Sequence, residues 1–194
     1  MNMGRPKILA FAGSARAESV NKKLVKIAAA GAVEAGADVT VIDLHDFPMP
    51  LYDGDLEQKE GLPLNARKIK DLMIAHQGFL ISSPEYNSSI APLFKNTIDW
   101  ASRQSDGEPS LAAFQGKVAG IMSASPGGLG GIRGLVHVRS ILENIGVIVI
   151  PNQVAVSKAH EVFNADGTLK DKKQEEQIKK IGYDLTKILL KLIS

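Results

Sequence analysis

The chain has 194 residues, of which 44% are hydrophobic, and a formal net charge of +2 from 23 basic and 21 acidic residues. This length and apolar content predict one well-buried domain over residues 1–194, and the balanced charge argues against a nucleic-acid or membrane surface. The lack of cysteine excludes disulfides, thiolate catalysis and cysteine-ligated metals. Because the sequence has no apolar leader and no membrane-length segment, we expect a soluble protein of the cytoplasm.

The segment Lys7–Asn21 combines a short apolar run, a polar loop and the start of a helix. Residues 8–12 are all apolar, which predicts a buried strand that ends at Gly13. A helix N-terminus presents unpaired amide groups and a partial positive charge, so this order of elements favours phosphate binding. The side chains that could add hydrogen bonds or charge are Ser14, Arg16, Ser19 and Asn21. A plain structural role stays open, with Ser19 only a helix cap and Arg16 only a solvated surface residue.

The remaining hydrophobic pattern alternates helices with strands. A helix is expected from Val20 to Gly31, and others around residues 66–73, after Pro92, and over 135–145 and 178–192. Strands are expected at residues 38–44, 79–82, 117–123 and 147–150, the last broken by Pro151 and resuming at 153–156. Pro151 favours an edge position, where a missing amide costs little. Residues 46–63 and 102–115 are expected as long irregular stretches.

The segment Ser83–Trp100 leaves the third strand as a polar loop that is rich in turn formers. Pro84 and the Asn-Ser-Ser run predict a stiff loop, and Pro92 then opens a helix at its first turn. Tyr86 could cover a planar ring at this strand end, or could be an ordinary surface aromatic. Trp100 is expected in the core or at a subunit contact rather than in a cofactor site.

The exit from the fourth strand, residues 124–134, is rich in glycine, which lets backbone amides approach a ligand closely. It is no dinucleotide fingerprint, because Arg133 stands where the last glycine belongs in G-x-G-x-x-G read from Gly128. A plain flexible loop is the alternative. The loops that begin at residues 13, 83 and 124 follow strands one, three and four. A parallel sheet of order 2-1-3-4-5, covered by helices on both faces, would bring them together at its carboxyl edge, where ligands bind.

Three motifs carry a resemblance to a known family: GSARAESVN at Gly13–Asn21, SPEYNSSIAPLFKNTIDW at Ser83–Trp100, and SPGGLGG at Ser125–Gly131. They resemble the NAD(P)H-dependent FMN reductases, flavodoxin-like flavoproteins that include soluble quinone and chromate reductases. The resemblance covers nearly the whole chain and implies a flavodoxin-like α/β three-layer sandwich with a five-stranded parallel sheet of order 2-1-3-4-5. It implies that the FMN phosphate is bound by Ser14, Arg16, Ser19 and Asn21. It also implies that the isoalloxazine is lined by Pro84, Glu85, Tyr86 and Asn87, and closed on its other side by Ser125, Gly127 and Gly128.

The activity that the resemblance implies is hydride transfer from NADPH or NADH to bound FMN, followed by electron transfer to quinones, free flavin or oxidised metal ions such as chromate. The flavin carries this chemistry, so no catalytic side chain is expected. We expect the Glu85 backbone to hold the flavin edge and its side chain to order neighbouring loops. No metal site is expected either, because the histidines are scattered without ligand spacing, at positions 45, 76, 137 and 160.

The resemblance also implies a homodimer or homotetramer in which the helices after Pro92 and Gly131 meet. Two other function classes stay open on the sequence: a flavodoxin-like electron carrier without nicotinamide chemistry, and a nucleotide-binding module without turnover. The electron acceptor and the choice between NADH and NADPH cannot be read from the residues.

Overall fold

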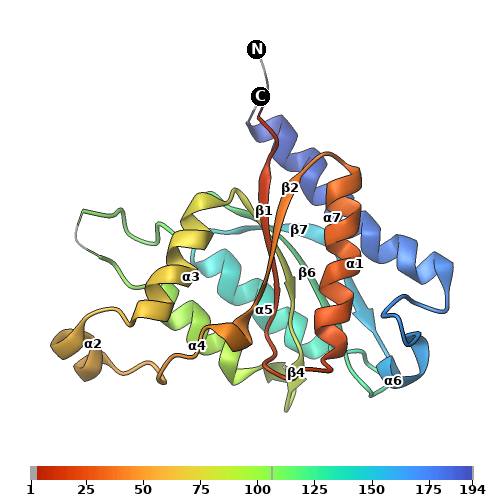
Figure 1. Ribbon diagram of the computed structural model, residues 1–194, viewed down its shortest axis with the longest axis horizontal. Helices are drawn as coiled ribbons and strands as arrows, with labels where there is room; N and C mark the ends of the chain where they lie inside the picture. The colour runs from red at the N-terminus through yellow and green to blue at the C-terminus, as the bar shows by residue number, and fades with distance from the viewer. Residues whose placement is uncertain (1–3, 106, 194) are drawn as a thin grey trace.

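The computed structural model describes residues 4–105 and 107–193, and a five-stranded parallel sheet runs through its centre (Figure 1). The strands lie in the order β2-β1-β3-β6-β7. Their bounds are β1 (Lys7–Ala12), β2 (Asp38–Asp43), β3 (Gly78–Ser82), β6 (Val118–Ala124) and β7 (Ile148–Val156). The predicted order is confirmed, because β6 and β7 are the fourth and fifth strands of this sheet. The strand order reverses between β1 and β3, so a crevice is expected at their carboxyl ends.

Helices cover both faces of the sheet. In Figure 1, α1 (Val20–Glu34) and α7 (Lys172–Leu192) lie to the right of the sheet, and α3 (Leu64–Ala75) and α4 (Pro92–Ala101) lie to its left. The helix α5 (Ile132–Asn144) packs on the same face as α3 and α4. Alternate strand residues supply the two cores, as the pleat requires: in β1, Ile8 and Ala10 face α1 and α7, whereas Leu9 and Phe11 face the other layer. The flavodoxin-like three-layer sandwich is confirmed.

The helices α1 and α7 touch through their backbones. A Cβ atom on Gly31 would lie 2.0 Å from the Lys179 carbonyl oxygen, and one on Gly182 would lie 1.9 Å from the Ala28 carbonyl oxygen. Glycine is therefore required at both positions, because no side chain fits between the helices. This contact fixes the axis of α1, whose first turn borders the carboxyl edge of the sheet.

The stretch 46–63 contains a helix, so its prediction as wholly irregular was wrong. A 3-10 turn, η1 (Leu44–Asp46), ends the run from β2, and α2 (Gly54–Glu60) follows farther along. The Asp53 carboxylate caps α2 by accepting bonds from the amides of Asp55, at 2.8 Å, and Leu56, at 3.3 Å. No residue of α2 is buried, and the helix projects from the body of the molecule (Figure 1).

The projecting segment is tied to α4 by buried polar groups. The Asn96 side chain donates to the Pro50 carbonyl at 2.9 Å and accepts from the Tyr52 amide at 2.8 Å. The Trp100 indole also donates to the Pro50 carbonyl, at 2.8 Å, and is fully buried. Trp100 therefore lies in the core, which was one of the two roles expected for it beside a subunit contact.

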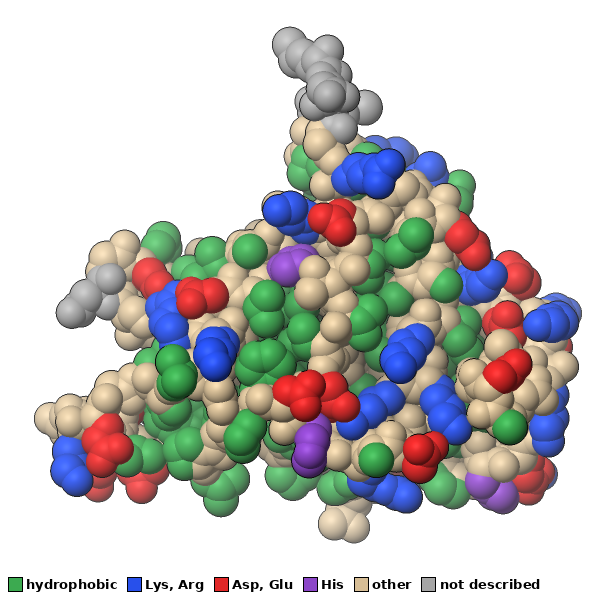
Figure 2. All heavy atoms as spheres, in the orientation of Figure 1, with side chains coloured by type: hydrophobic (Ala, Val, Ile, Leu, Met, Phe, Trp, Pro, Cys, Tyr) green, Lys and Arg blue, Asp and Glu red, His purple; other side chains and the backbone are tan. Residues whose placement is uncertain are grey.

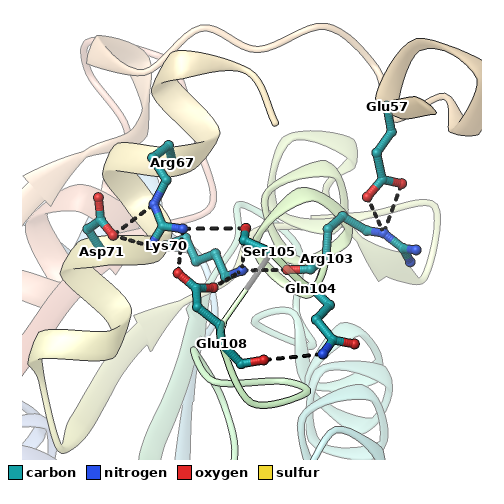
Figure 3. A network of polar contacts seen from close by, with 8 residues as sticks. All are labelled: Glu57, Arg67, Lys70, Asp71, Arg103, Gln104, Ser105 and Glu108. Carbon is teal, nitrogen blue, oxygen red and sulfur yellow. Dashed lines mark hydrogen bonds and ion pairs between the residues drawn. The ribbon is translucent and has the colours of Figure 1, made fainter. Parts of the chain in front are cut away.

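A buried lysine holds the turns that follow α4 (Figure 3). Residues 102–105 and 107–115 form turns, as the sequence indicates. The Lys70 side chain is 1% exposed, and its ammonium donates to the Arg103 carbonyl at 2.5 Å and pairs with the Glu108 carboxylate at 2.5 Å. Arg67 pairs with the same carboxylate at 2.5 Å and with Asp71 on its own helix. The charge of Lys70 is thus buried but matched.

The strand β7 continues through Pro151, but its pairing with β6 is interrupted there and resumes at Gln153, as predicted. Its edge position in the sheet is confirmed, and the ladder adapts by a bulge: Ala119 pairs with Val149, whereas Ile121 pairs with Gln153. The Arg139 guanidinium of α5 donates to carbonyl oxygens in this bulge, to Val149 at 3.1 Å and to Ile150 at 2.9 Å. It therefore provides a side-chain donor to backbone acceptors where the pairing is irregular.

Charged side chains of both signs are interspersed on the face drawn in Figure 2, with apolar side chains between them. This mixture agrees with the balanced composition of the chain. Among the residues that the structure describes, no helix is both long and apolar enough to cross a membrane.

Candidate functional site

A cavity of about 320 Å³ opens at the carboxyl edge of the sheet, where the strand order reverses. Segments from four parts of the chain meet there: the loop between β1 and α1, the residues after β3, the residues after β6, and the start of α6 (Ala159–Val162). The lining residues are Ser14, Arg16, Glu18, Ser19, Val20, Asn21, Pro84, Glu85, Tyr86, Ala124, Ser125, Pro126, Ala159 and His160. The expected meeting of the three loops is confirmed.

The loop between β1 and α1 forms one wall of the cavity. Gly13 bonds through its amide to the Ser82 carbonyl at 2.9 Å, and a Cβ atom there would lie 2.8 Å from the Phe94 Cβ. Ser19 is the N-cap of α1 by position, but its side chain makes no capping bond and the first turn holds no acidic residue. The positive end of this fully described helix is therefore left for another acceptor. Arg16 lines the same wall.

Asn21 serves the structure of this wall. Its side chain is 3% exposed; its amide nitrogen donates to the Ala124 carbonyl at 2.9 Å, and its oxygen accepts from the Ala124 amide at 3.0 Å. The same oxygen accepts from the Ser82 hydroxyl at 2.8 Å. Asn21 thus locks the first turn of α1 to the ends of β3 and β6. One N–H of its amide group is left over for a ligand, and its role as a phosphate donor stays a prediction.

The residues after β3 form a hairpin where a stiff loop was predicted. The strands β4 (Glu85–Tyr86) and β5 (Ser89–Ile90) pair antiparallel, and the two residues between them have φ of 50° at Asn87 and 65° at Ser88. Both residues have a left-handed backbone conformation, which is the conformation of the tight two-residue turns that fit the twist of a hairpin. Tyr86 lines the cavity and is 48% exposed, so its ring is available to a ligand. Asn87, at the tip, does not line the cavity.

Glu85 contributes to the cavity wall while its carboxylate bonds to α5. The carboxylate accepts from the Gly134 amide at 2.9 Å and from the Arg133 guanidinium at 2.8 Å. The side chain thus bonds to the start of α5, as expected of one that orders neighbouring segments, and the role of the Glu85 backbone at the flavin edge stays a prediction. Burial raises the pKa of the carboxyl, but the Gly134 amide and the Arg133 charge outweigh it, and the net pKa lies below the ordinary value.

The loop after β6 supplies the opposite wall through Ser125 and Pro126. Gly127 and Gly128, also predicted to bind the cofactor, do not line the cavity, and the Gly127 carbonyl instead accepts from the Lys158 amide at 3.2 Å. Their role toward a ligand stays a prediction. Within the described residues, no three His, Cys, Asp or Glu side chains are grouped to hold a metal ion.

Several lining residues were missed by the sequence reasoning, above all Ala159 and His160 of α6. The signal was present, because the fifth strand ends at the same edge as the first, third and fourth, so its exit also borders the crevice. Glu18, which lies between the predicted residues Arg16 and Ser19, also lines the cavity and was not predicted.

The donors of this cavity fit FMN. The free helix terminus, Arg16 and the Ser14 and Ser19 hydroxyls suit a phosphate dianion, and Tyr86 with Pro84 and Pro126 offers flat apolar surface for a ring. The cavity volume lies at the lower end of the range for small-ligand sites. Fold and site together define a flavodoxin-like α/β protein. Its crevice, where the strand order reverses, carries groups suited to binding an anion.

The chain matches the family model described as NADPH-dependent FMN reductase over residues 6–161. It belongs to that family, and it is an FMN-dependent NAD(P)H oxidoreductase.

Curated relatives agree over nearly the full length of the chain. An NAD(P)H-dependent FMN reductase of Pseudomonas aeruginosa is 35% identical over 173 residues, which are 89% of each chain. A probable NADPH:quinone oxidoreductase of Oryza sativa subsp. japonica is 33% identical, over 96% of this chain and 90% of the relative. Among solved structures, FerB, a flavoenzyme NAD(P)H:(acceptor) oxidoreductase of Paracoccus denitrificans, superposes with a TM-score of 0.78 at 26% identity, covering 94% of this chain and 96% of that one. An archaeal flavodoxin at 12% identity and a TM-score of 0.61 shares the fold alone.

Proposed function

We propose that this cavity holds FMN, with the phosphate at the start of α1 and the ring between the hairpin and the loop after β6. The observation that carries the proposal is the uncapped terminus of α1, which faces the cavity together with Arg16. The phosphate is assigned to Ser14, Arg16, Ser19 and Asn21. The ring is assigned to Pro84, Glu85, Tyr86 and Asn87 on one side and to Ser125, Gly127 and Gly128 on the other.

We further propose that quinones, free flavin or oxidised metal ions such as chromate accept the electrons. When bound, the flavin takes up a hydride from NADPH or NADH and passes electrons on to the acceptor. The residues of this chain position the partners: the α1 terminus and Arg16 anchor the phosphate, and half-exposed Tyr86 offers its ring to a planar molecule. The names of the quinone reductase relatives support this acceptor class.

The proposal is tested by titrating the protein with FMN and comparing Arg16→Ala with the wild type. One charged hydrogen-bonding partner contributes roughly 1.5–3 kcal/mol, so the FMN Kd should rise roughly ten- to hundredfold. Arg5→Ala is the matched control, because Arg5 is exposed and precedes the amino end of β1, away from the cavity. An unchanged Kd in Arg16→Ala would remove Arg16 from the site. A wild-type protein that binds FMN but does not oxidise NADPH or NADH with a quinone would instead be an electron carrier.

For the whole molecule we propose one domain, acting in the cytoplasm as a homodimer or homotetramer. Two layers of helices on one continuous sheet support the single domain, and the cysteine-free composition suits a reducing compartment. The proposed contact between subunits uses α4 and α5. Two apolar side chains are exposed there: Val136 in α5, at 61%, and Leu129 in the loop before α5, at 54%. Light scattering at working concentration tests the assembly, and a monomer mass would refute it.

A further inference from the structure

The carboxylate of Glu85 occupies the N-terminal turn of α5. Its Oε2 accepts from the Gly134 amide at 2.9 Å, and its Oε1 accepts from the Arg133 Nη2 at 2.8 Å and Nε at 3.2 Å. The Glu85 side chain is 9% exposed although it borders an open cavity, whereas that of Arg133 is 57% exposed. The first turn of α5 holds no acidic residue of its own, and Gly131 at its N-cap has no side chain to bond with. Glu85 therefore supplies the negative charge that this helix end favours.

The hairpin that carries Glu85 lies directly against the backbone of α5. A Cβ atom on Gly134 would lie 3.2 Å from the Ser89 carbonyl oxygen and 3.3 Å from the Glu85 Cβ. A second tie follows one turn along the helix, where the Ser89 hydroxyl and the His137 Nδ1 are 2.8 Å apart. The absence of a side chain at Gly134 thus allows the contact, and Glu85 and His137 fix its register along α5.

This attachment joins two walls of the cavity. The hairpin side presents Pro84, Glu85 and Tyr86, and the opposite side presents Ser125 and Pro126. The loop that holds Ser125 and Pro126 runs into α5 at Gly131. A bond from Glu85 to the first turn of α5 therefore links the two walls. Both carboxylate oxygens are already bonded to Gly134 or Arg133, which disfavours Glu85 as a proton acceptor for a substrate.

We propose that Glu85 is a positioning residue that sets the spacing between the hairpin and the loop after β6, and thereby the fit of a planar ring between them. The inference rests on the proposed function, since it takes the ring of FMN to lie between these walls. It assigns to the Glu85 carboxylate an effect on the ring alone, distinct from the effect of Arg16 on the phosphate.

The test compares FMN with riboflavin, which has the same ring and no phosphate. Binding of both flavins is measured for the wild type, Glu85→Ala, Glu85→Gln and Arg16→Ala. Glu85→Ala should weaken FMN and riboflavin by the same factor, about tenfold, whereas Arg16→Ala should weaken FMN alone. Glu85→Gln should bind more tightly than Glu85→Ala, because its amide oxygen still accepts from Gly134. The visible circular dichroism of bound FMN should change in Glu85→Ala and not in Arg16→Ala.

Glu57→Gln is the matched control for loss of a paired carboxylate. Glu57 accepts from the Arg103 Nε at 3.0 Å on the projecting segment and does not line the cavity. If Glu85→Ala does not fold, the same comparison of FMN and riboflavin binding is made with Glu85→Gln. Equal binding of both flavins by the wild type and the Glu85 variants would overturn the positioning role while leaving the proposed function intact. A wild-type protein that binds riboflavin and FMN equally weakly, with no effect of Arg16→Ala, would overturn the proposed function itself.

Discussion

Replacing Asn21 with alanine should destabilise the protein even when no ligand is present. The substitution removes a donor to the Ala124 carbonyl and an acceptor for the Ala124 amide and the Ser82 hydroxyl. A buried polar group left without a partner costs about 1–3 kcal/mol, and water from the adjoining cavity can reach some of these groups. We therefore expect a loss of about 3 kcal/mol in the free energy of unfolding, and a Tm lower by about 6–12 °C for a chain of this length.

The assay is urea denaturation of the flavin-free protein followed by far-UV circular dichroism. Asn144→Ala is the control, because Asn144 is also in a helix but is exposed at the end of α5. A loss below about 1 kcal/mol, or one equal to that of the control, would refute the view that Asn21 locks α1 to the ends of β3 and β6. Asn21 would then be free for a ligand, as the sequence alone suggested.

Two further substitutions test the packing and the buried charges. Gly182→Ala should lower the free energy of unfolding, measured by heat or urea, by about 3 kcal/mol or more, because its Cβ would meet the Ala28 carbonyl and neither helix can yield locally. Gly54→Ala is the control: α2 has room for a Cβ there, and the substitution should be nearly neutral. Glu108→Gln should cost roughly 3 kcal/mol at neutral pH, because it leaves the buried Lys70 charge without its carboxylate. The Lys70 ammonium and the Arg67 guanidinium hold the pKa of Glu108 below its usual 4.5, so this stabilisation is complete above that pH and is lost as the pH falls through the folded-state pKa. The acid branch of the stability profile should therefore be shallower in Glu108→Gln than in the wild type, and parallel profiles would contradict the assignment.

The carboxyl-edge site could be predicted because its signals are local. A buried strand followed by a polar loop and a helix fixes where Ser14, Arg16 and Ser19 must lie, and turn chemistry after β3 marks the second wall. The partners of Asn21 could not be predicted, because Ala124 is 103 residues away and only the sheet brings the two together. The sequence motif indicates an asparagine at this position, but it does not show whether its side-chain amide bonds to a ligand or to the protein backbone.

The missed helix α2 has a physical explanation. The helix α2 buries no residue, so it leaves no hydrophobic period to detect, and only the capping Asp53 marks its start. The interruption predicted at Pro151 is confirmed in the ladder, but its stabilisation by Arg139, a side chain of another element, could not be predicted.

The guanidinium seated in the β7 bulge also bears on how copies of the protein can meet. β7 is an outer strand, and such strands invite pairing with strands of other molecules. Here the carbonyls of Val149 and Ile150 already have a cationic partner, and Pro151 offers no amide for a new ladder. The middle of this edge is thereby closed to sheet extension, so a strand of another molecule cannot pair continuously along the whole of β7.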